Sequence, residues 1–139
     1  MSFSPFAGLA AAITGMGVEL EHHMLGSMEE ACKMIEDDAK DAIGTYRYGW
    51  PPLGEAAVAK HGDTPLLDTG ALKDSIQHTV VSPHEGYVGT NVEYAKYQEF
   101  GTSKISPRPF LGGAVEAKSA EFVECFGKAI KATIEGKKA

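Results

Sequence analysis

The hydrophobic and polar positions in the first third of the chain repeat with the period of a helix. Between Val18 and Ile43, apolar residues recur every three or four positions, and acidic residues fill many of the positions between them. That spacing puts the apolar side chains on one face, turn after turn. The pattern predicts one long amphipathic helix that ends at Gly44, followed by an ordered loop over 45–54, where two consecutive prolines prevent regular structure.

The middle of the chain carries weaker and shorter patterns. Residues 55–60 favour one or two helical turns before a Gly- and Pro-containing break. Further on, the side chain of Asp68 or Thr69 can accept hydrogen bonds from the free N–H groups at the start of a helix. We therefore expect a short helix there, with Leu72 and Ile76 on one side.

A hairpin and two helices are predicted in the remaining part. Alternating residues on both sides of the turn cluster SPHEG predict a β-hairpin over 77–90. A short helix follows from Tyr94 and ends at Gly101. A second long amphipathic helix starts at Pro109, since proline suits a first helical turn. Its apolar positions are Leu111, Val115, Phe122, Val123, Phe126, Ile130 and Ile134.

Together these elements predict an α+β fold, with a small antiparallel sheet packed with two long amphipathic helices and short helical segments. The 139 residues suit a single domain over 1–139. Residues 1–15 are apolar, but they lack a basic start and are too few to span a bilayer. We interpret them as a flexible or partner-docking N-terminal arm, and we expect synthesis in the cytoplasm without export.

Composition and charge narrow the function. A content of 43% hydrophobic and 23% charged residues is typical of a folded globular protein. The net charge of −6 argues against a protein that grips nucleic-acid phosphates, because that task needs clustered Lys and Arg. Cys32 and Cys125 are isolated, without a CxxC motif, and are predicted to be buried, reduced thiols.

No pattern of catalytic or metal-binding residues is found. His22 and His23 are adjacent on a helix and point about 100° apart, and His61, His78 and His84 occur in separate segments without ligand spacing. The serines near histidines lack a nucleophile elbow, and the glycine-containing segments lack the order that cradles phosphate. The sequence predicts no enzyme, no cofactor and no metal; a small hydrolase without a recognisable motif is the weaker alternative.

Rigid and aromatic residues are instead concentrated in the irregular segments. Such residues lose little entropy on binding and are favoured at the centres of protein interfaces. Arg108 lies between two prolines, so we expect its guanidinium to reach a carboxylate or backbone carbonyls, in a neighbouring subunit or in its own loop. The predicted interface residues are Trp50, Tyr94, Tyr97, Phe100, Thr102, Arg108 and Phe110.

Three short elements follow one another between residues 50 and 115. The first is Leu67, Thr69, Gly70 and Leu72; the second is Tyr94, Ala95, Glu99, Phe100, Gly101 and Thr102; the third is Arg108, Pro109 and Phe110. In this order and spacing, the chain resembles the tail-completion and neck proteins of tailed bacteriophages, including the virion-morphogenesis proteins of Mu-like phages.

The resemblance implies a structural virion protein without enzymatic activity. It would form a homo-oligomeric ring, expected to be six-fold, that joins the tail to the DNA-filled head and contacts neighbouring neck and tail proteins. DNA would pass through the channel without tight binding, which agrees with the acidic charge, and no membrane would be involved. A tail terminator or a head-completion stopper would have the same ring design, and both stay open as alternatives.

Overall fold

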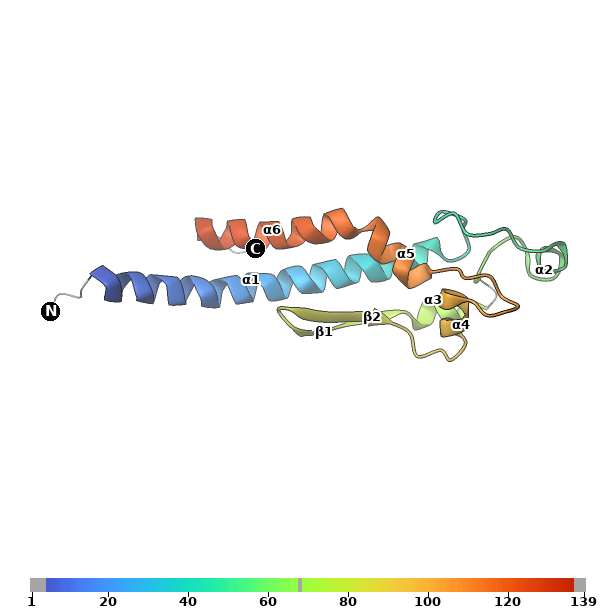
Figure 1. Ribbon diagram of the computed structural model, residues 1–139, viewed down its shortest axis with the longest axis horizontal. Coiled ribbons are helices and arrows are strands. Elements are labelled where there is room, and N and C mark those ends of the chain that lie inside the picture. The colour runs from blue at the N-terminus through green and yellow to red at the C-terminus, as the bar shows by residue number, and fades with distance from the viewer. Residues whose placement is uncertain (1–4, 68, 137–139) are drawn as a thin grey trace.

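The computed structural model describes residues 5–67 and 69–136, with side chains from Gly15 onward. The molecule is elongated, with two long helices running side by side and a hairpin along the opposite side of the first helix (Figure 1). A two-stranded antiparallel sheet with six helices confirms the predicted α+β fold. The elements are α1 (Pro5–Ala42), α2 (Glu55–His61), α3 (Ala71–Ser75), β1 (Gln77–Ser82), β2 (Glu85–Gly89), α4 (Ala95–Phe100), α5 (Phe110–Ala117) and α6 (Ser119–Glu135).

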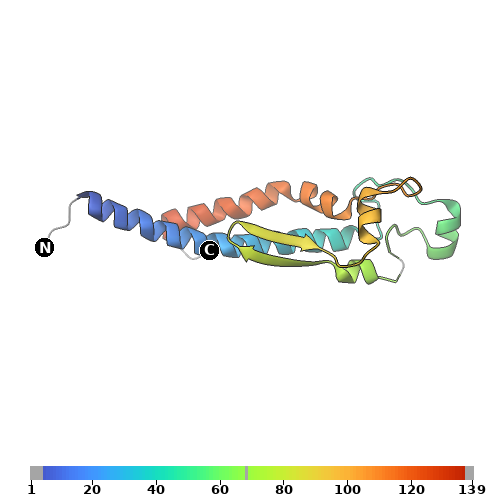
Figure 2. The ribbon, with the colours of Figure 1, turned by 60° about the horizontal axis from the view of Figure 1, so that its bottom comes forward.

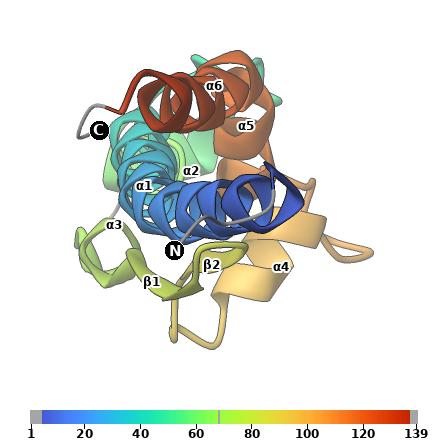
Figure 3. The same cartoon turned by 90° about the vertical axis from the view of Figure 1, so that its left-hand side faces the viewer.

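Helix α1 is the central element, with α6 on one side and the hairpin on the other (Figures 2 and 3). It begins at Pro5, thirteen residues before the predicted start at Val18, and ends at Ala42, two residues before the predicted stop at Gly44. Residues 5–15 of the predicted N-terminal arm are thus helical, and the first four lie outside the described residues. Docking of this arm to a partner stays a prediction.

Buried polar contacts set the antiparallel register of α1 and α6. The Thr133 hydroxyl donates to the Ala129 carbonyl at 2.9 Å. The imidazole of His23, whose Nδ1 lies 2.9 Å from Thr133 Oγ1, is therefore the donor in that contact. Ser27 donates to the Cys125 carbonyl at 2.9 Å. Because an unpaired buried polar group is costly, a shift of either helix along the other would be unfavourable.

The second long helix of the prediction is wrong in one respect: it is two helices, divided at Lys118. None of the apolar residues predicted for its inner face is fully buried: Leu111, Phe122 and Phe126 are half-buried, and the large side chain that this segment does bury is Phe110. Small residues of α6 face α1, namely Cys125, Ala129, Ala132 and Thr133. By contrast, Val123, Ile130 and Ile134 are 69%, 50% and 69% exposed. Spacings of seven and four residues place these three on one face, so α6 carries a second apolar surface that none of the described residues covers.

The core lies at the end of the molecule where α1 finishes. Its largest fully buried side chains include Phe110 and Ile76. Apolar residues from the second half of α1, the loop after it, α3, α4 and α5 meet there: Ile35, Ala39, Ala42, Ile43, Trp50, Leu72, Ile76, Ala95, Phe110 and Ala114. The long α1–α6 pair therefore extends from a compact head in which the short elements are packed.

One of the two residues predicted to accept a hydrogen bond at the start of α3 does so. Asp68 lies outside the described residues, but the Thr69 hydroxyl accepts a hydrogen bond from the Ala71 N–H at 3.3 Å. Leu72 and Ile76 are buried, at 2% and 1% exposed, as predicted for the inner side of this segment.

The hairpin packs closely on α1. Thr79 pairs with Tyr87 and Val80 with Gly86 across the two strands. A Cβ at Gly86 would lie 2.5 Å from Cys32 Sγ, so only glycine allows this approach of the strand to the helix. Cys32 and Cys125 are both free and buried, as predicted, and burial raises the pKa of each thiol.

His78 joins the hairpin to α1 through two carboxylates. Its Nε2 lies 2.5 Å from Glu29 Oε1, and its Nδ1 lies 3.4 Å from Glu36 Oε1. The hydrogen bond with Glu29 is the largest cause that raises the pKa of His78; the nearby Glu36 carboxylate raises it further, while burial opposes both. The imidazolium form is therefore favoured more in the folded chain than in the unfolded one.

We expect the stability of the hairpin to depend on pH through His78. A histidine whose pKa is raised on folding contributes stability that is full below its unfolded pKa of about 6.5 and is lost as pH rises through the folded value. In urea unfolding, the difference in the free energy of unfolding between wild type and His78→Gln should be larger at pH 6 than at pH 8. His84→Gln, in the same hairpin, is the control. An equal difference at both pH values would contradict this coupling.

Candidate functional site

Helix α4 and the residue that precedes it present three exposed aromatic side chains at one side of the head. Tyr94 and Tyr97 are each 46% exposed and Phe100 is 79% exposed. A spacing of three residues brings neighbours of this set close together on the helix surface. We call Tyr94, Tyr97 and Phe100 the aromatic patch. Exposed aromatic side chains grouped in this way are typical of a protein-docking surface.

The aromatic patch lies between two hollows of the surface. Tyr94 lines one, with a volume of about 530 Å³, together with residues of the loop before α3, among them Leu66 and Leu67. Tyr97 and Phe100 line the other, with a volume of about 910 Å³, along with residues of α5. A partner that covers α4 could therefore fill a depression on each side of it.

Glu99 fixes α4 against the start of α5. Its Oε1 accepts a hydrogen bond from the Leu111 N–H at 2.8 Å, and its Oε2 accepts one from the Gly112 N–H at 3.1 Å. These N–H groups lie in the first turn of α5 and have no partner within that helix. A carboxylate there also meets the positive end of the helix dipole. These contacts hold the backbone of α4, and with it the aromatic patch, in place against α5.

The loop between α4 and α5 is closed by its own hydrogen bonds. The Thr102 N–H donates to the Ile105 carbonyl at 2.8 Å, and the Thr102 hydroxyl accepts from the backbone N–H groups of Lys104 and Ile105. The Arg108 N–H donates to the Gln98 carbonyl at 2.7 Å, which brings the end of the loop back to α4. The loop is exposed, but these hydrogen bonds already restrict its backbone, so binding a partner would cost little further conformational entropy.

Arg108 contacts its own chain. Its Nη2 donates to the Pro51 carbonyl at 2.9 Å, and the residue is 8% exposed. The sequence predicts a partner for this guanidinium in a neighbouring subunit or in its own loop; in the structure it binds a backbone carbonyl of the same chain, but in the loop after α1 rather than in the loop of Arg108 itself. Trp50 and Phe110 are also buried, at 6% and 0% exposed. These three residues build the head, whereas Tyr94, Tyr97, Phe100 and Thr102 are exposed. Contact of any of the seven with a partner stays a prediction.

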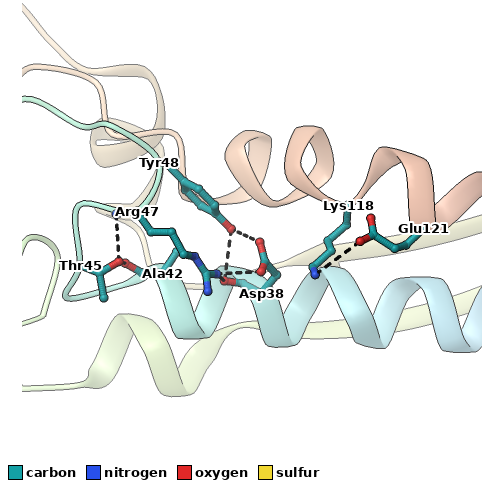
Figure 4. Close-up of polar contacts among 7 residues, drawn as sticks. All are labelled: Asp38, Ala42, Thr45, Arg47, Tyr48, Lys118 and Glu121. Atoms are coloured by element: carbon teal, nitrogen blue, oxygen red, sulfur yellow. Dashed lines mark hydrogen bonds and ion pairs between the residues drawn. The ribbon is translucent and has the colours of Figure 1, made fainter.

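A polar cluster anchors the loop that carries Trp50 and Pro51 (Figure 4). The Asp38 carboxylate accepts hydrogen bonds from the Arg47 guanidinium, at 2.7 Å, and from the Tyr48 hydroxyl. Burial, and next the bond to Asp38, raise the pKa of Tyr48. Its ring packs edge-on against Trp50 with centroids 5.6 Å apart. The end of α1 therefore positions the carbonyl that Arg108 binds.

Sequence reasoning missed Glu99 and the Asp38 cluster as structural supports. For Glu99, a signal was present: the acidic residue precedes Gly101 by two positions, and a proline opens the next helix soon afterwards. No comparable signal marks Asp38, which is one of several acids near the end of α1.

Within the described part of the chain, no group of three or more His, Cys, Asp or Glu residues lies close enough to hold a metal ion. Across the same residues, no helix has both the length and the apolar character needed to cross a bilayer.

Comparison with protein families gives a match. The model of the HK97-gp10-like family, described as "Bacteriophage HK97-gp10, putative tail-component", matches residues 9–101. The chain belongs to this family. Comparison with curated proteins and with solved structures found no match. The HK97-gp10-like match runs from α1 to the end of α4, so it includes the aromatic patch and stops where the closed loop begins.

Proposed function

We propose that this HK97-gp10-like chain is a structural subunit of the virion at the head–tail connection. In this role it is a tail-completion or neck protein, arranged as a six-fold ring, through which DNA passes without tight binding. The observation that carries the proposal is the family match to a phage tail component over residues 9–101. The net charge of −6 supports it, because an acidic subunit does not retain DNA in a channel.

The aromatic patch is the proposed contact with a neighbouring neck or tail protein. Its three side chains are exposed, while the backbone beneath them is held by Glu99 and by the loop closed at Thr102. A surface that is ordered before binding loses little entropy when a partner covers it. Trp50, Arg108 and Phe110 support this surface from inside the head rather than contributing to it directly.

The test measures how many tails are joined to heads during an infection in which the phage depends on the cloned protein. The double variant Tyr97→Ala/Phe100→Ala should keep its thermal melting temperature, because exposed side chains contribute little to stability. Loss of two central aromatic contacts typically weakens an interface by at least about 2 kcal/mol, or roughly 30-fold. We therefore expect free tails and DNA-filled heads to accumulate in place of joined particles, as seen by electron microscopy.

Tyr87→Ala is the matched control, because Tyr87 is an exposed tyrosine of the hairpin, away from α4. A normal yield of joined particles with the double variant would contradict the docking role of the aromatic patch. Normal joining in the complete absence of the protein would overturn the proposed function. Overlong tails in its absence would indicate a tail terminator, and filled heads that leak DNA would indicate a head-completion stopper.

A further inference from the structure

The first turns of α1 extend past every other described element of the molecule. His23 contacts Thr133 on α6, and α6 ends two residues later, at Glu135. The hairpin reaches α1 only from about Met28 onward, where Gly86 meets it. Residues 5–18 therefore form a projecting helix about 21 Å long at 1.5 Å per residue (Figures 1 and 2). We call this segment the projecting helix.

The composition of the projecting helix does not suit a helix surrounded by water. No Asp, Glu, Lys, Arg or His occurs among residues 1–18, although 23% of the whole chain is charged. The segment contains Gly8, Gly15 and Gly17, and each glycine disfavours a helix by about 1 kcal/mol relative to alanine. The segment continues α1 and needs no new helix nucleus, but most helical stability in proteins comes from tertiary packing, which no described element gives this segment. A packing partner would therefore stabilise it.

An apolar groove lies elsewhere on the same molecule, between the hairpin and the C-terminal helices. Its floor is the face of α1 that carries Met28, Cys32 and Ile35, and its walls include Val88 and Phe122. The volume is about 470 Å³. We call it the hairpin groove. Val115 and Val123 also line it, although they are 53% and 69% exposed.

The apolar surface continues from the hairpin groove along α6. Ile130 and Ile134 share the face of Val123 and are 50% and 69% exposed. The charged lining residue of the groove is Glu85, with His84 beside it, both at the hairpin turn. The groove and the projecting helix are therefore compatible in charge. The groove lining has one charged residue, Glu85, and the projecting helix has none. An uncharged helix laid into such a groove leaves no charge without water or a counter-ion.

The helix cannot reach the groove of its own chain. Helix α1 is continuous from Pro5 to Ala42, and the groove floor belongs to its second half. The projecting helix points away from that floor, and folding back would require a break in α1. A second copy of the chain, however, offers an identical groove to it.

We propose that the projecting helix of one copy binds in the hairpin groove of a second copy. The contact is heterologous, because it uses two different surfaces of each chain, and repetition closes into a ring when the rotation between copies permits. This inference rests on the proposed self-association of the chain into a ring, and it names the surfaces that meet. The aromatic patch on α4 is not part of this contact and is left for other virion proteins.

The experiment introduces one charged residue on each surface and uses the purified chain of residues 1–139. Wild type at tens of micromolar should have a molar mass several times that of the 14.8 kDa monomer by light scattering. Leu9→Glu alters the projecting helix, and Val123→Glu alters the groove wall. Each variant alone should be a monomer. Val123 is exposed, so its substitution should leave the melting temperature unchanged. Val81→Glu, at an exposed position of the hairpin, is the control and should stay oligomeric.

Mixing the two variants gives the decisive result. Leu9→Glu retains an intact groove and Val123→Glu retains an intact helix, so a one-to-one mixture should form a dimer that grows no further. Oligomers that persist in both single variants would overturn the inference while leaving the proposed ring intact. A mixture that stays monomeric, or wild type that is monomeric at every concentration, would also overturn it. If either variant gave a normal particle yield, virion assembly would not need this contact. That result would contradict the inference, but not a role of the protein at the head–tail connection.

Discussion

Replacement of Phe110 by alanine is expected to lower the free energy of unfolding by about 3–5 kcal/mol. Phe110 is fully buried at the centre of the head, among residues of α1, α4 and the loop that carries Trp50. Truncation removes its apolar contacts and leaves a cavity that the surrounding helices can fill only in part. The measurement is chemical unfolding of the purified variant, followed by circular dichroism.

Phe100→Ala is the matched control for this result, because it is the same chemical change at a position that is 79% exposed. We expect it to change the unfolding free energy by no more than about 0.5 kcal/mol. If the two variants were equally stable, the head would not be the core of the fold. If Phe110→Ala had the same free energy of unfolding as wild type but failed to assemble into particles, Phe110 would belong to an interface.

The second large effect is expected at Gly101, which ends α4. Its φ of 73° and ψ of 174° lie in a region that is almost exclusive to glycine. A Cβ there would also lie 2.7 Å from the Ile105 carbonyl oxygen and 2.8 Å from Pro107 Cδ. Backbone strain of about 1–3 kcal/mol and this clash should act together, so Gly101→Ala should cost about 3 kcal/mol or more.

Gly62→Ala separates the two causes. Gly62 has nearly the same backbone conformation, with φ 84° and ψ 171°, but its nearest neighbour would be Thr64 Oγ1 at 3.9 Å. This variant should therefore show the strain without the clash. Equal losses in the two variants, compared by thermal and urea unfolding, would mean that the closed loop yields to the added methyl group and is not rigid.

Several elements were predictable because their signals are local. The period of α1, the hairpin around its turn cluster and the glycine that ends α4 each depend on residues within one or two turns of one another. That the chain is a phage tail-type protein could also be predicted from the sequence, because the elements that carry the resemblance are short; the first of the three, and the second up to Gly101, lie within the matched residues 9–101. The aromatic residues of α4 were identified on the same grounds, and their exposure agrees with a docking role that is still to be tested.

The candidate interface shows where local signals end. Phe100 and Phe110 look alike in the sequence, each beside a glycine or a proline at the end of a predicted helix. One is 79% exposed and the other is fully buried. What separates them is the path of the loop between them, which returns through Arg108 to Gln98 and Pro51. These contacts join residues up to 57 positions apart, and no short pattern records them.

By itself, the sequence determined which segments are helical or extended, where most of them end, and that the chain resembles phage tail proteins. The tertiary structure decided which face of each element is buried. On α6 the apolar side chains of Val123, Ile130 and Ile134 remain exposed while small residues pack on α1, and the helical period is the same for both faces. Periodicity records that a face is apolar, but burial depends on which surface fits closely against a distant neighbour. Small side chains let α6 approach α1 closely enough for the His23–Thr133 and Ser27–Cys125 contacts, and the face left over is available to another chain.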